Sequence, residues 1–185
     1  MGCLLGVYNR IDESTLSGGS WVSSLPLTNL KTKVLGRVAR STNTALTSTI
    51  FVIDLGQPRK IEVLSLVNHN ISLGGKVRMQ ASETNFGAAL YDSGEFDAWP
   101  TMFRTETLDW ENDSYWSGQY SNEETFGYTP TAVHLPTSEI YARYWKVEII
   151  DVDNLAGFIQ VGRVFIGSVW APERDAEVGL SIAWE

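Results

Sequence analysis

The sequence predicts an all-β sandwich from three observations. First, the apolar runs Ile50–Leu55 and Ile61–Val67 are rich in β-branched residues and are bounded by Gly, Pro and Asn, as strands are. Second, Lys76–Ser82 and Tyr141–Ile150 alternate with the period of two that a strand shows. Third, no segment of the 185 residues predicts a helix. This length allows one well-buried core and is short for two domains.

We expect three parts along the chain: an N-terminal arm or peripheral strand (1–15), the sandwich (16–167) and a C-terminal extension (168–185). Within the sandwich, Ile61–Val67 is apolar on both faces, which favours a central strand covered on both sides. Pro58 has no backbone N–H, so an open loop is expected before this strand. The two neighbouring runs have the pattern of a chain that passes from one sheet to the other.

Three further segments complete the expected strands. A short strand begins at Leu90–Tyr91, another spans Ala132–Leu135, and Phe158–Ile166 closes the sheet.

Residues 95–128 differ in composition from the strands around them. They hold nine of the chain's 21 aromatic residues and eight acidic residues against one arginine, Arg104. No steady period of 2 or 3.6 runs through them, so we expect a long loop insertion, and loops of this length are usually functional or disordered. The aromatic content argues against disorder.

The aromatic residues of this loop are the main candidates for binding a ligand or partner, and three interpretations stay open. Their rings could stack on a sugar, anchor a subunit interface, or cover one end of the sandwich. The candidates are Trp99, Trp110, Tyr115, Trp116 and Tyr120.

Composition excludes several classes of function. The net charge of −8 and the scattered Lys and Arg argue against binding of nucleic acid. There is no apolar run of about 18 residues, so membrane insertion is not expected, and the N-terminus lacks the basic region of a signal peptide. Cys3 is the only cysteine, which excludes an internal disulfide and a cysteine-based metal site.

With these strands in place, the chain resembles a discoidin-like jelly-roll domain, the type found in coagulation factors. The resemblance rests on segments from Phe51–Gly56 with Pro58, Lys76–Ser82, Ala142–Glu148 and Gly162–Gly167. The chain also resembles a group of tailed-phage virion proteins built on that domain, through Leu25-Pro26 with Asn29-Leu30, Val67-Asn68-His69-Asn70 and Pro172-Glu173-Arg174.

The second resemblance implies a non-enzymatic structural component of a phage tail, in the tail-tip or baseplate region. Such a protein would contact other virion proteins, self-associate in a ring, and be assembled in the host cytoplasm, where the absence of paired cysteines is expected. The alternatives are a carbohydrate-binding module that attaches to a host-surface glycan and, third, a capsid decoration protein.

Catalytic and metal-binding chemistry has little support in the sequence. The only histidines are His69 and His134, and neither has a cysteine partner, so no enzyme is expected. His69 follows a buried strand and is expected to hold the next turn by hydrogen bonds, with contact to a ligand as the alternative. Asp151, Asp153 and Asn154 offer oxygens to a calcium ion, the one cofactor considered, but a solvated turn is the alternative because the glycine and glutamate of a calcium loop are missing.

Overall fold

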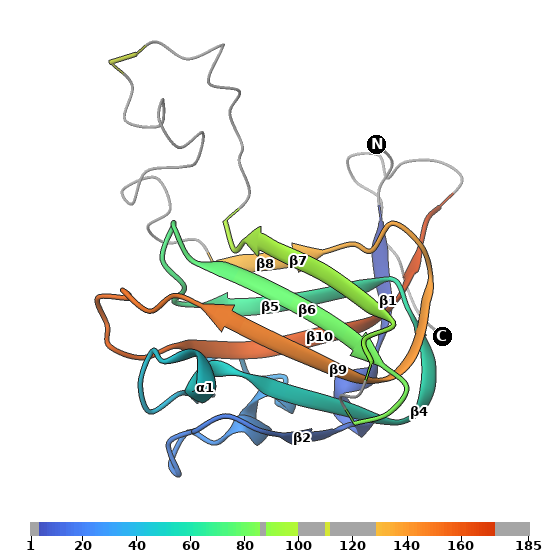
Figure 1. Ribbon diagram of the computed structural model, residues 1–185, viewed down its shortest axis with the longest axis horizontal. Coiled ribbons are helices and arrows are strands. Elements are labelled where there is room, and N and C mark those ends of the chain that lie inside the picture. The colour runs from blue at the N-terminus through green and yellow to red at the C-terminus, as the bar shows by residue number, and fades with distance from the viewer. Residues whose placement is uncertain (1–3, 86–87, 100–109, 112–128, 173–185) are drawn as a thin grey trace.

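In the computed structural model, which describes residues 4–85, 88–99, 110–111 and 129–172, ten strands form two antiparallel sheets (Figure 1). The strands are β1 (Leu5–Asn9), β2 (Thr15–Ser17), β3 (Ala39–Arg40), β4 (Phe51–Ile61), β5 (Val63–His69), β6 (Lys76–Ser82), β7 (Tyr91–Asp97), β8 (Thr131–His134), β9 (Ile140–Ile150) and β10 (Gln160–Trp170). The helices are short: the 3-10 turns η1 (Arg10–Glu13) and η2 (Leu27–Lys31), and one α-helical turn, α1 (Leu46–Thr49).

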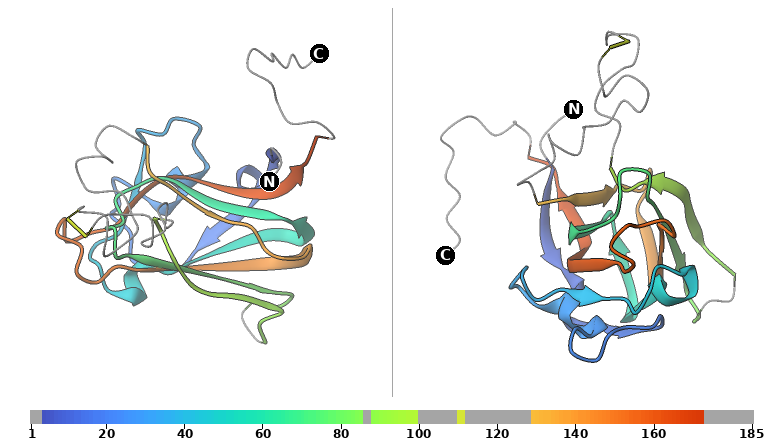
Figure 2. Two further views of the ribbon diagram at one scale, coloured as in Figure 1. Left: turned by 90° about the horizontal axis from the view of Figure 1, so that it is seen from above. Right: turned by 90° about the vertical axis from the view of Figure 1, so that its left-hand side faces the viewer.

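The two sheets pack face to face, which confirms the predicted β-sandwich. Sheet A has the order β1-β10-β5-β8, with β3 also paired to β10, and sheet B has the order β2-β4-β9-β6-β7. Figure 2 (left) shows the two layers from the side. No helix among the described residues has the length and apolar character needed to cross a membrane.

The chain crosses from sheet B to sheet A between β4 and β5, as the sequence predicted. The predicted open loop around Pro58 is wrong, because β4 continues through it as a bulge. The pairing jumps from Asp54 opposite Tyr144 to Arg59 opposite Ala142. Gly56 takes a positive φ of 75° in this bulge, where a proline is tolerated because its missing N–H breaks no ladder bond.

Both sheets contribute to the core the side chains of every second strand residue, which point inward. On β6, Val77, Met79 and Ala81 are fully buried, as the period of two predicted. They face the apolar side chains of sheet A across the sandwich, and Trp145 is the largest fully buried side chain. Further core side chains are Phe51, Ile53, Leu64, Leu66, Val147, Ile149, Val164 and Ile166.

Edge strands β7 and β8 close one side of the sandwich. The Tyr91 hydroxyl lies 2.6 Å from His134 Nε2, and the Phe96 ring stacks on His134 with centroids 4.8 Å apart. Burial lowers the pKa of His134 and raises the pKa of Tyr91, so both groups are neutral near pH 7. The contact therefore joins the two strands between which residues 98–130 are inserted.

Both ends of the chain add to sheet A. Residues 5–9, expected as an arm or peripheral strand, form the edge strand β1, and Ile11 beyond it is fully buried. β10 continues to Trp170, where it pairs with Leu5, so the sheet extends past residue 167. The extension from residue 173 lies outside the described residues.

Candidate functional site

Three connections meet at one end of the sandwich, which we call the insertion end. They are residues 41–50 with α1, the β5–β6 connection (70–75) and the β9–β10 connection (151–159). Strand β7 ends and strand β8 begins beside them (Figure 1, left side; Figure 2, right). Ala98, directly after β7, is held at this end, where its N donates to Gly75 O at 3.0 Å. At the opposite end, the termini end, β1 begins and β10 finishes.

Asp151 joins two of these connections. Its carboxylate accepts hydrogen bonds from Ser72 N (2.8 Å), Ser72 Oγ (2.6 Å) and Asn154 Nδ2 (2.7 Å), and the residue is only 6% exposed. Hydrogen bonds to an ionised carboxylate are stronger than those between neutral groups, especially where water is excluded. Asp151 therefore fixes the β5–β6 connection against the β9–β10 connection.

Two asparagines extend this network. Asn154 Nδ2 also donates to Asn70 O at 2.8 Å, and Asn154 Oδ1 accepts from Ala156 N at 3.0 Å. Asn70 in turn donates to Phe158 O (2.9 Å) and accepts from Gln160 N (2.7 Å). The backbone of both connections is thus held by buried or half-buried side chains rather than by a ladder.

A hollow of about 340 Å³ lies between the connections fixed by Asp151, and its size is within the usual range of small-molecule sites. Lys76 and Asp153 supply a cation and a carboxylate to its wall, and Val152, 58% exposed, supplies an apolar surface. The other lining residues are Ser72, Gly74, Ile150 and Asp151.

His69 lies inside this end of the core and is 4% exposed. Asn68 before it has a positive φ of 58°, which few non-glycine residues adopt. His69 Nδ1 accepts from Ile71 N at 3.3 Å, and the ring meets Trp99 edge-on with centroids 5.6 Å apart. Burial lowers the pKa of His69 to about 4, against a smaller opposing effect of Asp151. The residue therefore holds the turn as a neutral acceptor.

The aromatic candidates occupy different settings. Trp99 is half-buried against the core, and its indole N–H donates to Ile71 O at 2.8 Å. Trp110 is 71% exposed. The other three candidates, Tyr115, Trp116 and Tyr120, lie outside the described residues, so their role stays a prediction.

Two of the residues considered for calcium, Asp151 and Asn154, are engaged in hydrogen bonds. Three hydrogen-bond donors converge on Asp151, and Asn154 Oδ1 is used within its own turn. Asp153 is exposed. In the described part of the chain, no group of three or more His, Cys, Asp or Glu side chains is arranged to hold a metal. The donor set thus fits a hydrogen-bonded network better than a calcium ion.

Sequence reasoning did not select Asn70, Ser72 and Lys76 as site residues. Asn70 belonged to the Val67–Asn70 motif and Lys76 to the predicted strand Lys76–Ser82, and neither signal pointed to a site. Their relation to Asp151 could not be seen, because Ser72 and Asp151 are 79 positions apart.

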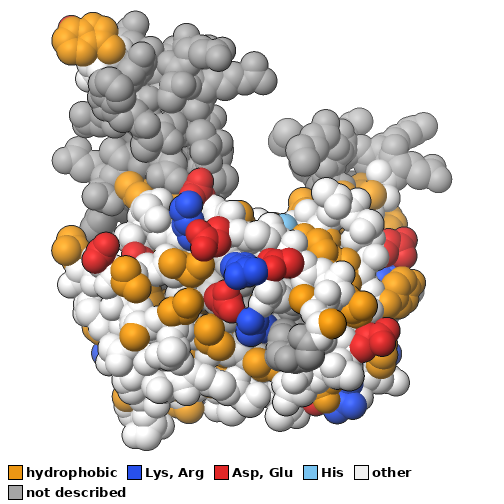
Figure 3. Space-filling view, in the orientation of Figure 1, with side chains coloured by type: hydrophobic (Ala, Val, Ile, Leu, Met, Phe, Trp, Pro, Cys, Tyr) orange, Lys and Arg blue, Asp and Glu red, His pale blue; other side chains and the backbone are white. Residues whose placement is uncertain are grey.

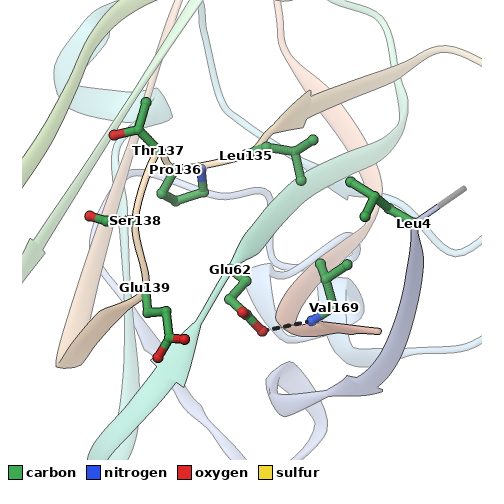
Figure 4. Close-up of a pocket in the computed structure, with 8 residues that line it drawn as sticks. All are labelled: Leu4, Glu62, Leu135, Pro136, Thr137, Ser138, Glu139 and Val169. Atoms are coloured by element: carbon green, nitrogen blue, oxygen red, sulfur yellow. Dashed lines mark hydrogen bonds between the residues drawn. The ribbon is translucent and has the colours of Figure 1, made fainter. Parts of the chain in front are cut away.

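A second hollow, of about 290 Å³, lies at the termini end (Figure 4). Glu62 and Glu139 line one part of it, and Leu4, Leu135 and Val169 line another. Glu62 Oε2 accepts from Val169 N at 3.0 Å, the bond drawn in Figure 4, and this bond lowers the pKa of Glu62.

The fold is shared with solved carbohydrate-binding proteins, all at low sequence identity. A family 32 carbohydrate-binding module from C. perfringens NanJ, in complex with galactose, is 13% identical, with a TM-score of 0.54 over 85% of this chain and 96% of that one. The lectin domain of lectinolysin, complexed with Lewis B antigen, is 15% identical, with a TM-score of 0.56 over 93% of this chain and 100% of that one. A fucose-binding module of Streptococcus pneumoniae is 12% identical, with a TM-score of 0.55 over 86% and 94%.

No family model matches the sequence, and no curated protein matches it. The structural matches support the discoidin-like fold. They give no support to a place in a phage virion.

Proposed function

We propose that this chain is a non-catalytic carbohydrate-binding module that holds a sugar in the hollow at the insertion end. The observation that most supports this is the Asp151 network, which fixes two connections around a hollow bearing both a donor and an acceptor. Preformed sites of this kind bind small ligands without first losing the entropy of ordering a loop. The shared fold with modules that bind galactose, fucose or Lewis antigens agrees with this proposal.

Each wall of the hollow suits one part of a sugar. The Lys76 ammonium donates to a hydroxyl oxygen, and the Asp153 carboxylate accepts from a hydroxyl group. Val152 offers an apolar surface to the C–H groups of the ring. The exposed Trp110 is available for stacking on a longer glycan.

The absence of catalysis is part of the proposal. Both histidines are engaged in packing: His69 with Ile71 and Trp99, and His134 with Tyr91 and Phe96. Neither lines the hollow at the insertion end. General acid–base catalysis requires a group within hydrogen-bond reach of the substrate, and these histidines do not provide it.

A glycan array followed by titration calorimetry with galactose and fucose tests this function. We expect binding that weakens at least about tenfold in Lys76→Met and in Asp153→Asn, since each removes a charged hydrogen bond. Lys33→Met and Glu83→Gln alter exposed residues elsewhere and should leave affinity unchanged. Glycan binding that survives both site variants would move the site away from this hollow, and a blank array would refute the function itself.

The role in a phage tail and the assembly into a ring stay predictions. The molecular mass of the purified protein in solution tests the ring directly, because a monomer at high concentration would contradict it.

A further inference from the structure

The two outer faces of the sandwich differ in chemistry. The outer face of sheet B carries a row of acidic and basic side chains (Figure 3). They pair with one another, as Lys146 with Glu148 at 2.8 Å, Arg143 with Asp54 at 2.7 Å, and Arg78 with Asp92. A face covered by partly exposed ion pairs is suited to contact with water.

The outer face of sheet A is mostly apolar. Ser65 on β5 pairs with Phe165 on one side and with Val133 on the other, so these three side chains point to the same face. Leu135 lies two positions after Val133, and Val169 lies four positions after Phe165, so both continue that face toward the termini end. Val133 is 52% exposed and Leu135 is 40% exposed.

Arg163 lies at the far end of this face. Arg163 is bound there by Asp12 at 2.9 Å.

The hollow at the termini end adjoins this apolar face and carries excess negative charge (Figure 4). Glu62 and Glu139 both line it, and Lys60 lies 3.1 Å from the first carboxylate and 2.9 Å from the second. One ammonium between two carboxylates leaves one negative charge. The Glu139 side chain is 53% exposed and can accept a further hydrogen bond.

We propose that the outer face of sheet A binds a partner polypeptide, which lays apolar side chains along Val133, Leu135 and Phe165 and inserts a basic side chain into the hollow beside Glu139. Exposed apolar surface next to a charged anchor is typical of protein interfaces. Charge argues against a second copy as the occupant, because the chain itself carries a net charge of −8. The stem of a lysine packs on Leu4 and Val169 while its ammonium reaches the carboxylates.

Amide NMR titration with two capped peptides, acetyl-Val-Lys-Val-amide and acetyl-Val-Gln-Val-amide, tests the proposal. The lysine peptide should shift the amides of Val133, Phe165 and Glu139 and bind about three- to fivefold more tightly than the glutamine peptide at low salt. Glu139→Gln should remove that preference, and Val133→Ser should weaken both peptides.

Two matched variants serve as controls. Glu83→Gln alters an exposed glutamate outside the hollow, and Leu155→Ser alters an exposed leucine of the β9–β10 connection that lines neither hollow, so both should bind like the parent protein.

Four results would overturn the proposal. They are equal binding of the two peptides, shifts that map away from sheet A, binding of n-butylammonium as tight as that of the lysine peptide, and a concentration-dependent dimer that covers this face without peptide. Sugar binding at the insertion end is independent of all four, so it can stand or fail separately.

Discussion

Replacing Asp151 by alanine tests whether one buried carboxylate holds the insertion end together. The change deletes three hydrogen bonds and leaves the Ser72 N–H, the Ser72 hydroxyl and one N–H of the Asn154 amide without their acceptor. Because Asn154 is 9% exposed, water does not readily replace the partner that its amide loses, whereas the exposed Ser72 can be hydrated in part. Removing the acceptor therefore costs both the bonds and the desolvation of the donors.

The expected loss is about 3 kcal/mol in the free energy of unfolding, since bonds to a charged group contribute roughly 1.5–3 kcal/mol each and do not add fully. For a domain of this size, that corresponds to a fall in Tm of about 6–12 °C. Urea denaturation followed by circular dichroism gives the first quantity, and calorimetry gives the second.

Asp153→Ala is the matched control, because Asp153 is exposed in the same turn. It should change stability by no more than about 0.5 kcal/mol. If both variants lose the same stability, or if Asp151→Ala costs less than about 1 kcal/mol, the network does not stabilise the two connections as we argue.

Calcium offers an independent check of the same reasoning. A hydrogen-bonded Asp151 predicts that calcium chloride and EDTA leave the Tm of the parent protein unchanged. A rise in Tm with calcium that Asp151→Ala abolishes would instead identify this carboxylate as a cation ligand.

Three further predictions concern pH, the indole of Trp99 and two glycines. Burial lowers the pKa of His69 from 6.5 to about 4, so the unfolded chain binds a proton more readily than the folded chain does. Up to about 3 kcal/mol of the free energy of unfolding is therefore lost as pH falls from 6.5 to 4. His69→Gln should reduce this pH dependence in urea titrations, and an unchanged pH dependence would assign it to other groups. Trp99→Phe keeps an aromatic ring but removes the hydrogen bond to Ile71 O, so it should lower the free energy of unfolding by about 1 kcal/mol. Trp110→Phe, at an exposed position, should cause no measurable loss. Equal losses in the two variants would contradict a stabilising role for the Trp99 indole N–H. Gly19→Ala should destabilise the fold more than Gly56→Ala. Both glycines have a positive φ, but only at Gly19 would an added Cβ clash with the backbone, at 2.5 Å from Ile50 O. Thermal melts in which Gly56→Ala has the lower Tm would disprove this clash.

The strands were largely predictable because their signal is local. The period of two in Lys76–Ser82 matches β6 to the residue, and the twin runs around Gly56 correctly indicated a passage from one sheet to the other. The bulge was not predictable, because the pairing of Asp54 and Arg59 depends on the facing strand β9. For the same reason Pro58 suggested a loop where a distorted strand forms.

The site was less predictable than the fold. Asp151 and Asn154 were considered as calcium ligands or as part of a solvated turn, and in the structure their oxygens accept hydrogen bonds from donors on the same turn and on a distant connection. His69 was expected to hold a turn, and its bond to Ile71 N agrees with that expectation. Three of the five aromatic candidates lie outside the described residues, so the structure neither supports nor opposes them.

The sequence by itself determined the fold class, the presence of the seven strands from β4 to β10 and the acidic, aromatic character of residues 95–128. These properties follow from alternation and composition, which neighbouring residues express without reference to the rest of the chain. Only the tertiary structure decided which polar groups meet. Asp151 and Ser72 come together through the pairing of β6 with β9, whereas Tyr91 and His134 meet where the edge strands of the two sheets lie against each other. The hollow at the insertion end, the apolar outer face of sheet A and the burial of His69 all result from that packing.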